Sequence, residues 1–342
     1  MKKNSIQQKM KVALIGVGKQ SVDDHIPALK NSSRVELVAI QDINPKIAQE
    51  YGRRLGISAY TSLSDLLKNH KIDFAVVAVP HDQYIKIIRE LASSGIHILK
   101  EKPLALNFRE AVAMREIVSK SGVELMVTLQ RRFNPIFSSF TQSMKSIGQP
   151  FFVEAKYSMF IDNPDKGWRG YKERAGGGCL IDMGYHLIDL IIWYFGLPDN
   201  IHAEFRTLAK PLKYYDAEDT ASVLFRYSDR GLFGTLLVSR YIPPKTEYLR
   251  LIGTNGIVEV RKGELLRYKN NGELVERLVR DTGWPTAAVA QIDYFCGVIQ
   301  GKEPNIGDVT YHLQHMAFIE ACYRSQKLCR FVNPFDIIDK YA

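Results

Sequence analysis

The chain has few cysteines and no long apolar stretch. Its four cysteines, Cys179, Cys296, Cys322 and Cys329, include no Cys-x-x-Cys pair, which argues against a disulfide framework and a structural zinc site. No apolar run approaches the roughly 18 residues that a membrane helix needs. The polar segment Met1–Met10 lacks the apolar middle of a signal peptide. These absences predict a reduced, cytoplasmic protein with no membrane partner and no bound metal.

The positive charge is spread thinly along the chain. The formal net charge is +9, from 46 lysine and arginine residues against 37 aspartate and glutamate residues. Basic pairs such as Arg53-Arg54, Arg131-Arg132 and Arg261-Lys262 are isolated, and no basic run alternates with aromatic residues. A solvated surface explains this pattern better than a nucleic-acid partner does. The excess charge still favours small anionic ligands, such as a dinucleotide or a phosphorylated sugar.

The first third of the 342 residues alternates short apolar runs with helical patterns, and the total length is sufficient for two domains. The runs, typical of buried parallel strands, cover residues 12–16, 35–40, 74–79, 96–99 and 123–127, and the helical patterns cover 45–55, 82–93 and 108–119. This alternation predicts an α/β domain over residues 10–128, built on a doubly wound parallel sheet.

The pattern changes after residue 128. One helix is expected at residues 135–145, followed by strand patterns at 151–160, 201–207, 220–227, 232–239, 248–252 and 257–260. Helical patterns are absent between most of these strands, so their sheet should be mostly antiparallel. Amphipathic helices at 287–299 and 308–326 end the pattern. We therefore predict a second, α+β domain over residues 129–342.

A glycine turn, Gly16-Val17-Gly18-Lys19-Gln20-Ser21, follows the first apolar run. The first glycine suits a tight turn, and Gly18 allows the backbone to approach a pyrophosphate at the N-terminus of the next helix. Ser21 replaces the usual third glycine or alanine and is small enough for close packing. We expect Gly16, Gly18, Lys19 and Gln20 to contact a dinucleotide cofactor.

Asp42 ends the second apolar run. A carboxylate at this point can accept hydrogen bonds from the adenosine ribose and repels a 2′-phosphate, which favours NAD over NADP. The alternative is a turn or capping aspartate ahead of Pro45. Lys46 leaves NADP open as a cofactor.

Lys102 lies in the segment Lys100-Glu101-Lys102-Pro103, directly after the fourth apolar run. The C-terminal ends of parallel strands face the ligand crevice of an open α/β sheet. An ammonium group there can hydrogen-bond a carbinol oxygen and stabilise developing alkoxide charge. On its own, this lysine would be interpreted as an exposed loop residue.

The most informative stretch is Gly176-Gly177-Gly178 and the apolar helix expected after it. In that helix Asp182 and His186 are four residues apart and so share a face, which Asp189 also joins. A neighbouring carboxylate holds an imidazole in one orientation and tautomer, as a proton-transferring histidine requires. A core histidine is the alternative interpretation of His186.

The loop before this stretch, residues 163–174, carries Trp168 and Arg169. An indole ring can cover the apolar face of a sugar or cyclitol, and a guanidinium can bind an anionic group. Packing of Trp168 as an anchor is an equally good interpretation. Arg131 at the domain junction is a further candidate for contact with substrate.

Several of these segments together resemble the Gfo/Idh/MocA oxidoreductases over nearly the whole chain. The resemblance depends on the glycine turn, Ala78-Val79-Pro80, Glu101-Lys102-Pro103, residues 130–135 (Gln-Arg-Arg-Phe-Asn-Pro), and the triple glycine followed by Asp182 and His186. It implies an N-terminal Rossmann domain and a C-terminal α/β domain with an open mixed sheet. It also implies Lys102, Asp182 and His186 as the catalytic group, and a homodimer or homotetramer formed through the sheet.

The expected activity is NAD(P)-dependent interconversion of a secondary alcohol and a ketone on a sugar, sugar derivative or cyclitol. Lys102 and His186 would take part in the reaction and bind substrate, and Pro80, His81, Glu101 and Lys102 would contact the cofactor. His81 stands where many members have asparagine, so the role of this loop differs from the family pattern. A non-catalytic dinucleotide sensor on the same fold is the main alternative. A zinc dehydrogenase is weaker, because no second cysteine or histidine completes a ligand set with Cys179.

Overall fold

The computed structural model describes residues 8–164, 166–207, 215–280 and 285–341. Residues 1–7, and with them most of the expected polar N-terminal segment, lie outside this range, as does residue 165 of the loop 163–174. The chain divides into two compact units. Unit 1 comprises Met1–Lys102, Ala113–Phe133 and Gly283–Val309, and unit 2 comprises Pro103–Val112, Asn134–Thr282 and Thr310–Ala342. The predicted boundary at residues 128/129 remains a prediction. Residues 103–112 belong to unit 2 and residues 283–309 belong to unit 1, so each unit contains a segment from the other side of that boundary.

Unit 1 contains a parallel sheet in the order β3-β2-β1-β4-β5-β6. Its strands are β1 (Met10–Ile15), β2 (Val35–Gln41), β3 (Ser58–Tyr60), β4 (Phe74–Val77), β5 (His97–Lys100) and β6 (Leu125–Val127). This order confirms the predicted doubly wound sheet, in which ligands bind where the strand order reverses, between β1 and β4. β4 ends two residues earlier than predicted, because Pro80 restricts the residue before it and offers no N–H for pairing.

The helices of unit 1 are α1 (Ile26–Asn31), α2 (Pro45–Leu55), α3 (Leu63–Asn69), α4 (Tyr84–Ser93) and α9 (Thr286–Ile299), and α5 (Phe108–Ser121) is shared with unit 2. α2 spans the predicted residues because its ends are marked. The Asn44 side chain accepts the Lys46 N–H at the start, and Gly56 adopts φ +68° at the end. β3 and α3 were missed, since elements this short show little periodicity.

α9 packs in the core of unit 1, although its sequence position placed it in the second predicted domain. Ala288, Ile292 and Phe295 lie in one buried cluster with residues of β1 and α1. The Phe295 ring meets Phe74 of β4 edge-on, with centroids 5.3 Å apart. A helix pattern read along the chain indicates that one face is buried but not which sheet covers it.

Unit 2 contains the second sheet, in the order β14-β13-β12-β11-β7-β10-β9-β8. Its strands are β7 (Pro150–Phe160), β8 (Asn200–Arg206), β9 (Thr220–Tyr227), β10 (Leu232–Ser239), β11 (Tyr241–Gly253), β12 (Gly256–Arg261), β13 (Glu264–Tyr268) and β14 (Leu274–Val279). Neighbouring strands are antiparallel except β7 and β10, which are parallel. The predicted mostly antiparallel sheet is confirmed, with β13 and β14 as unpredicted additions.

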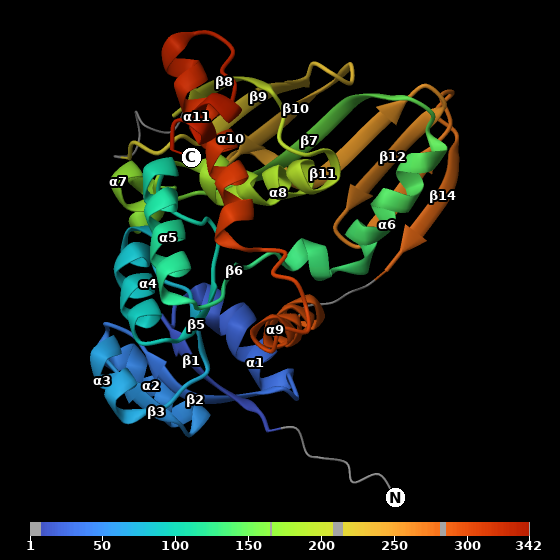
Figure 1. The fold of residues 1–342 in the computed structure, drawn as a ribbon. Helices are drawn as coiled ribbons and strands as arrows, with labels where there is room; N and C mark the ends of the chain where they lie inside the picture. The colour runs from blue at the N-terminus through green and yellow to red at the C-terminus, as the bar shows by residue number, and fades with distance from the viewer. Residues whose placement is uncertain (1–7, 165, 208–214, 281–284, 342) are drawn as a thin grey trace, which may run out of the picture. The chain divides into compact units, whose positions relative to one another are not determined.

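Helices cover one face of this sheet. α6 (Pro135–Ser143) packs on β12 and β13, and α8 (Tyr185–Phe195) packs on β7; Figure 1 shows α6 in front of these outer strands. Unit 2 also contains α7 (Lys172–Ala175), α10 (Val309–Leu328) and α11 (Phe335–Asp339). On the strands, fully buried Val153, Leu249 and Val258 alternate with part-exposed residues that point to the opposite, open face.

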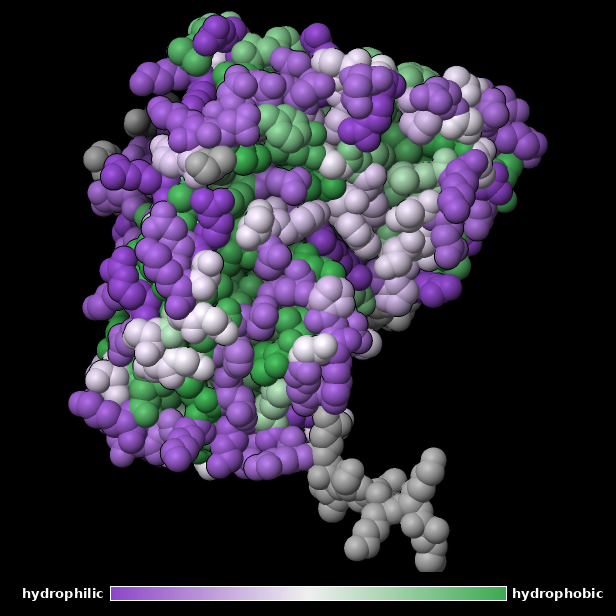
Figure 2. Space-filling model, in the orientation of Figure 1, coloured by the Kyte–Doolittle hydropathy of each residue, from purple (hydrophilic) through white to green (hydrophobic). Residues whose placement is uncertain are grey.

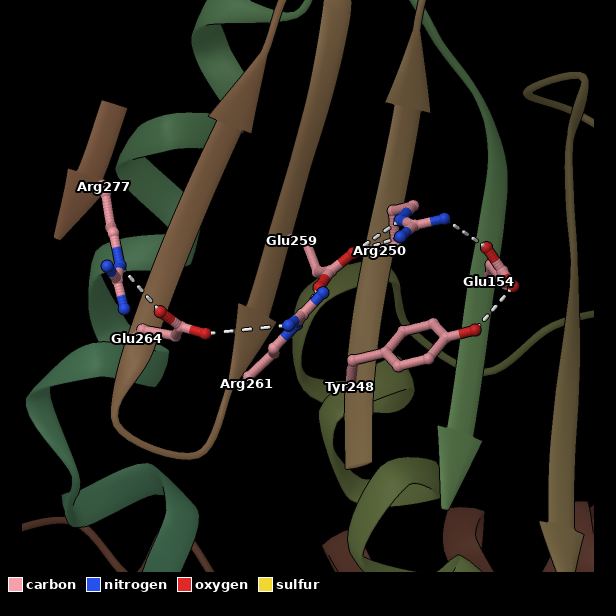
Figure 3. A network of polar contacts seen from close by, with 7 residues as sticks. All are labelled: Glu154, Tyr248, Arg250, Glu259, Arg261, Glu264 and Arg277. Atoms are coloured by element: carbon pink, nitrogen blue, oxygen red, sulfur yellow. Dashed lines mark hydrogen bonds and ion pairs between the residues drawn. The ribbon is translucent and has the colours of Figure 1, made fainter. Parts of the chain in front are cut away.

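The open face carries a row of paired charges across β7, β11, β12, β13 and β14 (Figure 3). The ion pairs join Glu154 to Arg250 at 3.0 Å, Arg250 to Glu259 at 2.5 Å, Glu259 to Arg261, Arg261 to Glu264 at 3.7 Å, and Glu264 to Arg277 at 3.0 Å. Tyr248 donates to Glu154, and burial together with this carboxylate raises the pKa of the tyrosine to about 12. We call these seven residues the charge ladder.

Lys172–Phe195 is, among the described residues, the one helical segment long and apolar enough to cross a membrane. It joins α7 to α8, and 83% of its most apolar window is buried inside the protein. Hydrophilic residues predominate on the surface seen in Figure 2, with hydrophobic residues in separate patches. The burial indicates a core helix of unit 2, and this core helix is the segment in which the sequence placed Asp182 and His186.

Candidate functional site

The glycine turn of unit 1 has the geometry that a dinucleotide requires. Gly16 has φ +86°, and a Cβ there would lie 2.4 Å from the Ala78 carbonyl oxygen, so only glycine fits. A Cβ at Gly18 would meet no atom within 4 Å. The first glycine therefore lets β1 and β4 approach each other, and the second leaves open space beside the backbone where a pyrophosphate can lie.

Two side chains hold this turn in shape. The Ser21 hydroxyl, fully buried, donates to the Gly16 carbonyl oxygen at 2.6 Å, so serine fills the place of the third small residue. Asp42 accepts the Val17 N–H at 2.8 Å with one carboxylate oxygen and the Asn44 N–H at 2.8 Å with the other. Asp42 therefore has a structural role at the turn. Asn44, not Asp42, caps α2.

The other predicted cofactor contacts lie around the same sheet edge. Lys19 and Gln20 pair with Asp23 and Asp24, one helical turn further on. Burial raises the pKa of Asp24 to about 6. After Pro80, His81 is buried, and its ring stacks on Tyr84 with centroids 5.5 Å apart. This loop side chain therefore packs inside unit 1.

Lys102 is the second residue after β5, at the strand end where the sequence placed it. The residues before it are rigidly held: the buried Lys100 donates to the Glu101 carbonyl oxygen at 2.7 Å and lies 3.5 Å from the centre of the Tyr84 ring. The carboxylate of Glu101 lies 2.9 Å from Nε2 of His25. Glu101 is thus a buried, paired carboxylate beside the lysine.

In unit 2 the triple glycine lies against Tyr323 and the Glu218 backbone. A Cβ on Gly177 would lie 1.9 Å from the Tyr323 hydroxyl, and one on Gly178 would lie 1.9 Å from the Glu218 carbonyl oxygen. The Glu218 carboxylate accepts the N–H groups of Gly178 at 2.8 Å and Leu180 at 3.2 Å, and the Tyr323 hydroxyl at 2.9 Å. This buried carboxylate satisfies and electrostatically favours the start of the helix.

The prediction of a regular α-helix directly after the glycines is wrong for its first turn. Leu180–Gly184 forms a π-helical turn, and α8 begins only at Tyr185. A π-turn spaces residues differently from an α-helix, and this turn includes Asp182. Its carboxylate lies 3.0 Å from Nη2 of Arg240, a side chain that is only 3% exposed, and 3.4 Å from Nε of Arg169.

His186 lies in the first turn of α8 and is half-buried. Its neighbours in sequence form a second, fully internal network with α10. The Tyr185 hydroxyl lies 2.7 Å from Nδ1 of His312, and Asp189 lies 2.9 Å from Nε2 of His315. Asp189, which the spacing assigned to the His186 face, is therefore buried and bound to a histidine. The network fixes α8 against α10.

The predicted substrate residues are divided between the units. In unit 2 Arg169 stacks on Trp168 at 4.4 Å while it approaches Asp182, so these three side chains form one cluster. Trp168 is half-buried and Arg169 is exposed. Arg131 belongs to unit 1, in a 3₁₀ turn over Gln130–Phe133, and is half-buried.

Three residues that hold the site were missed from the sequence: His25, Glu218 and Arg240. Each is buried and pairs with a residue at least 40 positions away in the chain. The adjacent acids Glu218-Asp219, directly before an apolar strand pattern, were the one available signal, because buried acids need partners. His25 and Arg240 stand in ordinary helix and strand-end contexts.

Cys179 does not have the character of a metal ligand. Burial raises the pKa of its thiol well above the ordinary value, so the thiol stays protonated. Within the described ranges, no three histidine, cysteine, aspartate or glutamate side chains gather as a metal site.

Sequence models of one protein family match both parts of the chain. A Gfo/Idh/MocA model described as an NAD-binding Rossmann fold matches residues 10–129, and the family's C-terminal domain model matches residues 143–259. The chain belongs to the Gfo/Idh/MocA oxidoreductase family. The match confirms the expected NAD-binding domain, and the open space at Gly18 fits that cofactor.

Individual relatives support the same assignment. A D-xylose 1-dehydrogenase (NADP(+)) from Haloferax volcanii is 26% identical over 322 residues, which cover 91% of this chain and 94% of the relative. The WlbA dehydrogenase of Bordetella pertussis, solved in complex with NADH and UDP-GlcNAcA, is 26% identical with a TM-score of 0.81, covering 95% of this chain and 99% of that one. An oxidoreductase subunit from Amycolatopsis mediterranei is 28% identical over 188 residues, yet only 52% of its length is covered.

A methyl group would meet open space at Gly18 but backbone atoms at Gly178. Alanine substitutions at these two positions therefore distinguish an effect on cofactor binding from an effect on folding. We expect Gly178→Ala to lower the free energy of unfolding by about 2 kcal/mol or more through overpacking. Gly18→Ala should leave this free energy within about 0.5 kcal/mol of the parent but weaken NADH binding, because its Cβ enters the open space. Thermal unfolding and NADH fluorescence titration measure the two effects. Equal loss of stability in both variants would contradict the assignment.

Proposed function

We propose that the protein interconverts a secondary alcohol and a ketone on a sugar, sugar derivative or cyclitol, with NAD as the hydride carrier. Lys102, Asp182 and His186 form the catalytic group. The family membership supports an oxidoreductase. Lys102 in unit 1 and Asp182 and His186 in unit 2 are side chains of the kind that this chemistry needs.

One hydrogen bond carries the proposal that Lys102 and His186 act together. Leu104 lies two residues after Lys102 in the chain and belongs to unit 2. Its backbone N–H donates to the hydroxyl of Tyr185 at 3.4 Å, and Tyr185 directly precedes His186. Within unit 2, the segment that follows Lys102 in the chain is therefore fixed against the residue that precedes His186.

In the proposed reaction His186 removes the hydroxyl proton of the alcohol as general base and returns it during reduction. The Lys102 ammonium hydrogen-bonds the same oxygen and stabilises its negative charge. The nicotinamide, when bound, accepts or gives the hydride. We propose that Asp182, which Arg240 and Arg169 hold in place, orients the His186 ring.

The cluster of Trp168 and Arg169 supports a sugar-like substrate. An indole face suits the apolar face of a pyranose or cyclitol ring, and the exposed guanidinium suits an anionic substituent. We propose Arg131 as a further contact. The relatives named above include a sugar dehydrogenase and a dehydrogenase crystallised with a nucleotide sugar, and both are compatible with this class.

We propose that the protein is a cytoplasmic homodimer or homotetramer whose subunits meet through the open face of the second sheet. Phe152 and Phe233 pair on neighbouring strands of that face, with ring centroids 5.0 Å apart, and Phe233 is 44% exposed. The charge ladder beside them contains three glutamates and three arginines. Its formal charges cancel, so a second subunit can cover it without leaving an uncompensated charge.

Substitution of the catalytic group tests the reaction. With a panel of polyols, sugars and sugar phosphates, we expect Lys102→Ala and His186→Ala each to lower kcat by about 10²–10⁴-fold, measured at the reduced-nicotinamide absorbance. Both variants should still bind NADH, with a dissociation constant within about tenfold of the parent. Lys68→Ala, on an exposed side chain of α3, and His202→Ala, on β8, serve as controls. Near-normal turnover in the first pair would refute the assigned roles.

Asp42 decides between the two cofactors. Asp42→Ala removes the ribose acceptor and should shift the ratio of NAD to NADP affinity toward NADP by about tenfold. The control is Asn44→Ala, which removes the cap of α2 and should weaken the turn without changing the ratio. Isothermal titration with each cofactor gives the ratios. An unchanged ratio in Asp42→Ala assigns the residue to turn structure alone.

The oligomer is tested by a charge on the open face. Light scattering should show the parent as a dimer or tetramer of the 38.9 kDa chain. Phe233→Glu should yield monomers, because a buried unpaired carboxylate is costly. Ile43→Glu, which replaces a residue 87% exposed in unit 1, should leave the mass unchanged. A monomeric parent would refute the interface.

A further inference from the structure

His25 lies at the end of the π-helical turn Ser21–His25 that follows the glycine turn. Its side chain is 4% exposed, and its Nε2 lies 2.9 Å from a carboxylate oxygen of Glu101, which is 8% exposed. A histidine Nε2–H donates to a carboxylate in both the neutral and the protonated ring. This contact joins the helical turn after the glycine turn, Ser21–His25, to Glu101, which directly precedes Lys102. We call this turn the nucleotide-binding helix.

Glu101 is fixed at its backbone as well as at its carboxylate. Its N–H donates to the Val77 carbonyl oxygen at 2.9 Å, and its carbonyl oxygen accepts the ammonium of Lys100 at 2.7 Å. The Thr128 N–H donates to the Lys100 carbonyl oxygen at 2.8 Å, which ties the preceding residue to the end of β6. The peptide that precedes Lys102 is therefore held by residues at the ends of β4, β5 and β6. These bonds fix the backbone from which the Lys102 side chain extends.

The charge of Glu101 depends on its partners. Burial raises the pKa of this carboxyl, but the hydrogen bond from His25 and the positive charges of His25 and Lys102 lower it by more, so the net pKa lies below the ordinary value. The group is a buried carboxylate at neutral pH. Removal of the His25 donor would leave this carboxylate poorly paired, which is strongly unfavourable. Lys102 is a nearby cation that could compensate it.

We propose that His25 and Glu101 are positioning residues for Lys102, and that His25 prevents Glu101 from capturing the Lys102 ammonium. With His25 bound to the carboxylate, Glu101 does not compete for the Lys102 ammonium, whose proposed role is at the cofactor and substrate. The inference rests on the proposed placement of Lys102 at the cofactor. It is tested by NADH binding alone, which requires no substrate.

The experiment compares NADH dissociation constants by fluorescence titration. We expect His25→Leu to raise the constant about tenfold, whereas His25→Gln, whose amide keeps a donor at the same reach, should stay within about threefold of the parent. The decisive variant is His25→Leu/Glu101→Gln. It removes the capturing charge and should restore the constant to within about threefold, because loss of both partners costs less than loss of one.

Two controls separate positioning from general damage. His97→Leu removes a histidine whose Nδ1 accepts the Glu124 N–H at 2.9 Å at the opposite end of β5, and it should not change NADH binding. In a Lys102→Ala background, His25→Leu should have no further effect, since the residue through which it acts is gone.

The proposal is overturned if His25→Leu leaves NADH binding unchanged, if Glu101→Gln does not rescue it, or if the effects of His25→Leu and Lys102→Ala multiply. If His25→Leu fails to fold, the variants His25→Gln and His25→Leu/Glu101→Gln are compared with the parent. Loss of NADH affinity in either variant also overturns the proposal. Turnover of Lys102→Ala separately tests catalysis. Retained turnover with the NADH pattern above would refute the proposed chemistry and leave the positioning role intact.

Discussion

Buried carboxylates determine where the functional segments lie. A carboxylate removed from water must find hydrogen-bond donors or positive charges, and Glu101 and Glu218 each find them in a distant part of the chain. Glu101 pairs with His25, which joins the nucleotide-binding helix to the segment of Lys102. Glu218, just before β9, accepts the N–H groups of Gly178 and Leu180. These bonds join the start of β9 to the segment that leads into α8, the helix of His186. In each unit, one buried acid therefore fixes the backbone of a segment that carries a proposed catalytic residue.

Close packing accounts for the glycines that surround these carboxylates. Glu218 can reach the two N–H groups because Gly178 has no side chain to separate the backbones. Gly16 similarly allows β1 and β4 to approach at the strand-order reversal. Gly18 is different, because its missing side chain leaves space and not contact. Glycines that are indistinguishable in the sequence thus have two functions, one in folding and one in access for a ligand.

The sequence predicted those features whose signals are local. The strand–turn–helix context of Gly16 and Gly18, the bounds of α2 and the alternation in β9 and β10 all depend on neighbouring residues. The sequence did not predict that α9 packs with unit 1, that Arg240 binds Asp182, or that His25 pairs with Glu101, because each depends on segments brought together only by the fold. The π-turn over Leu180–Gly184 was missed for the same reason: its first residues bond to Glu218, outside the helix.

The open face of the second sheet follows the rule that governs the interior. Glu259 is fully buried on that face and shares its carboxylate between Arg250 and Arg261. A solvent-facing sheet does not need such pairing, since water satisfies surface charges and exposed ion pairs add little stability. Pairing of every charge in the ladder, beside the aromatic pair of Phe152 and Phe233, is what a face requires if it is to be removed from water. The same physical constraint that pairs the buried acids in each unit therefore applies to this face, and it is compatible with the proposed contact between subunits.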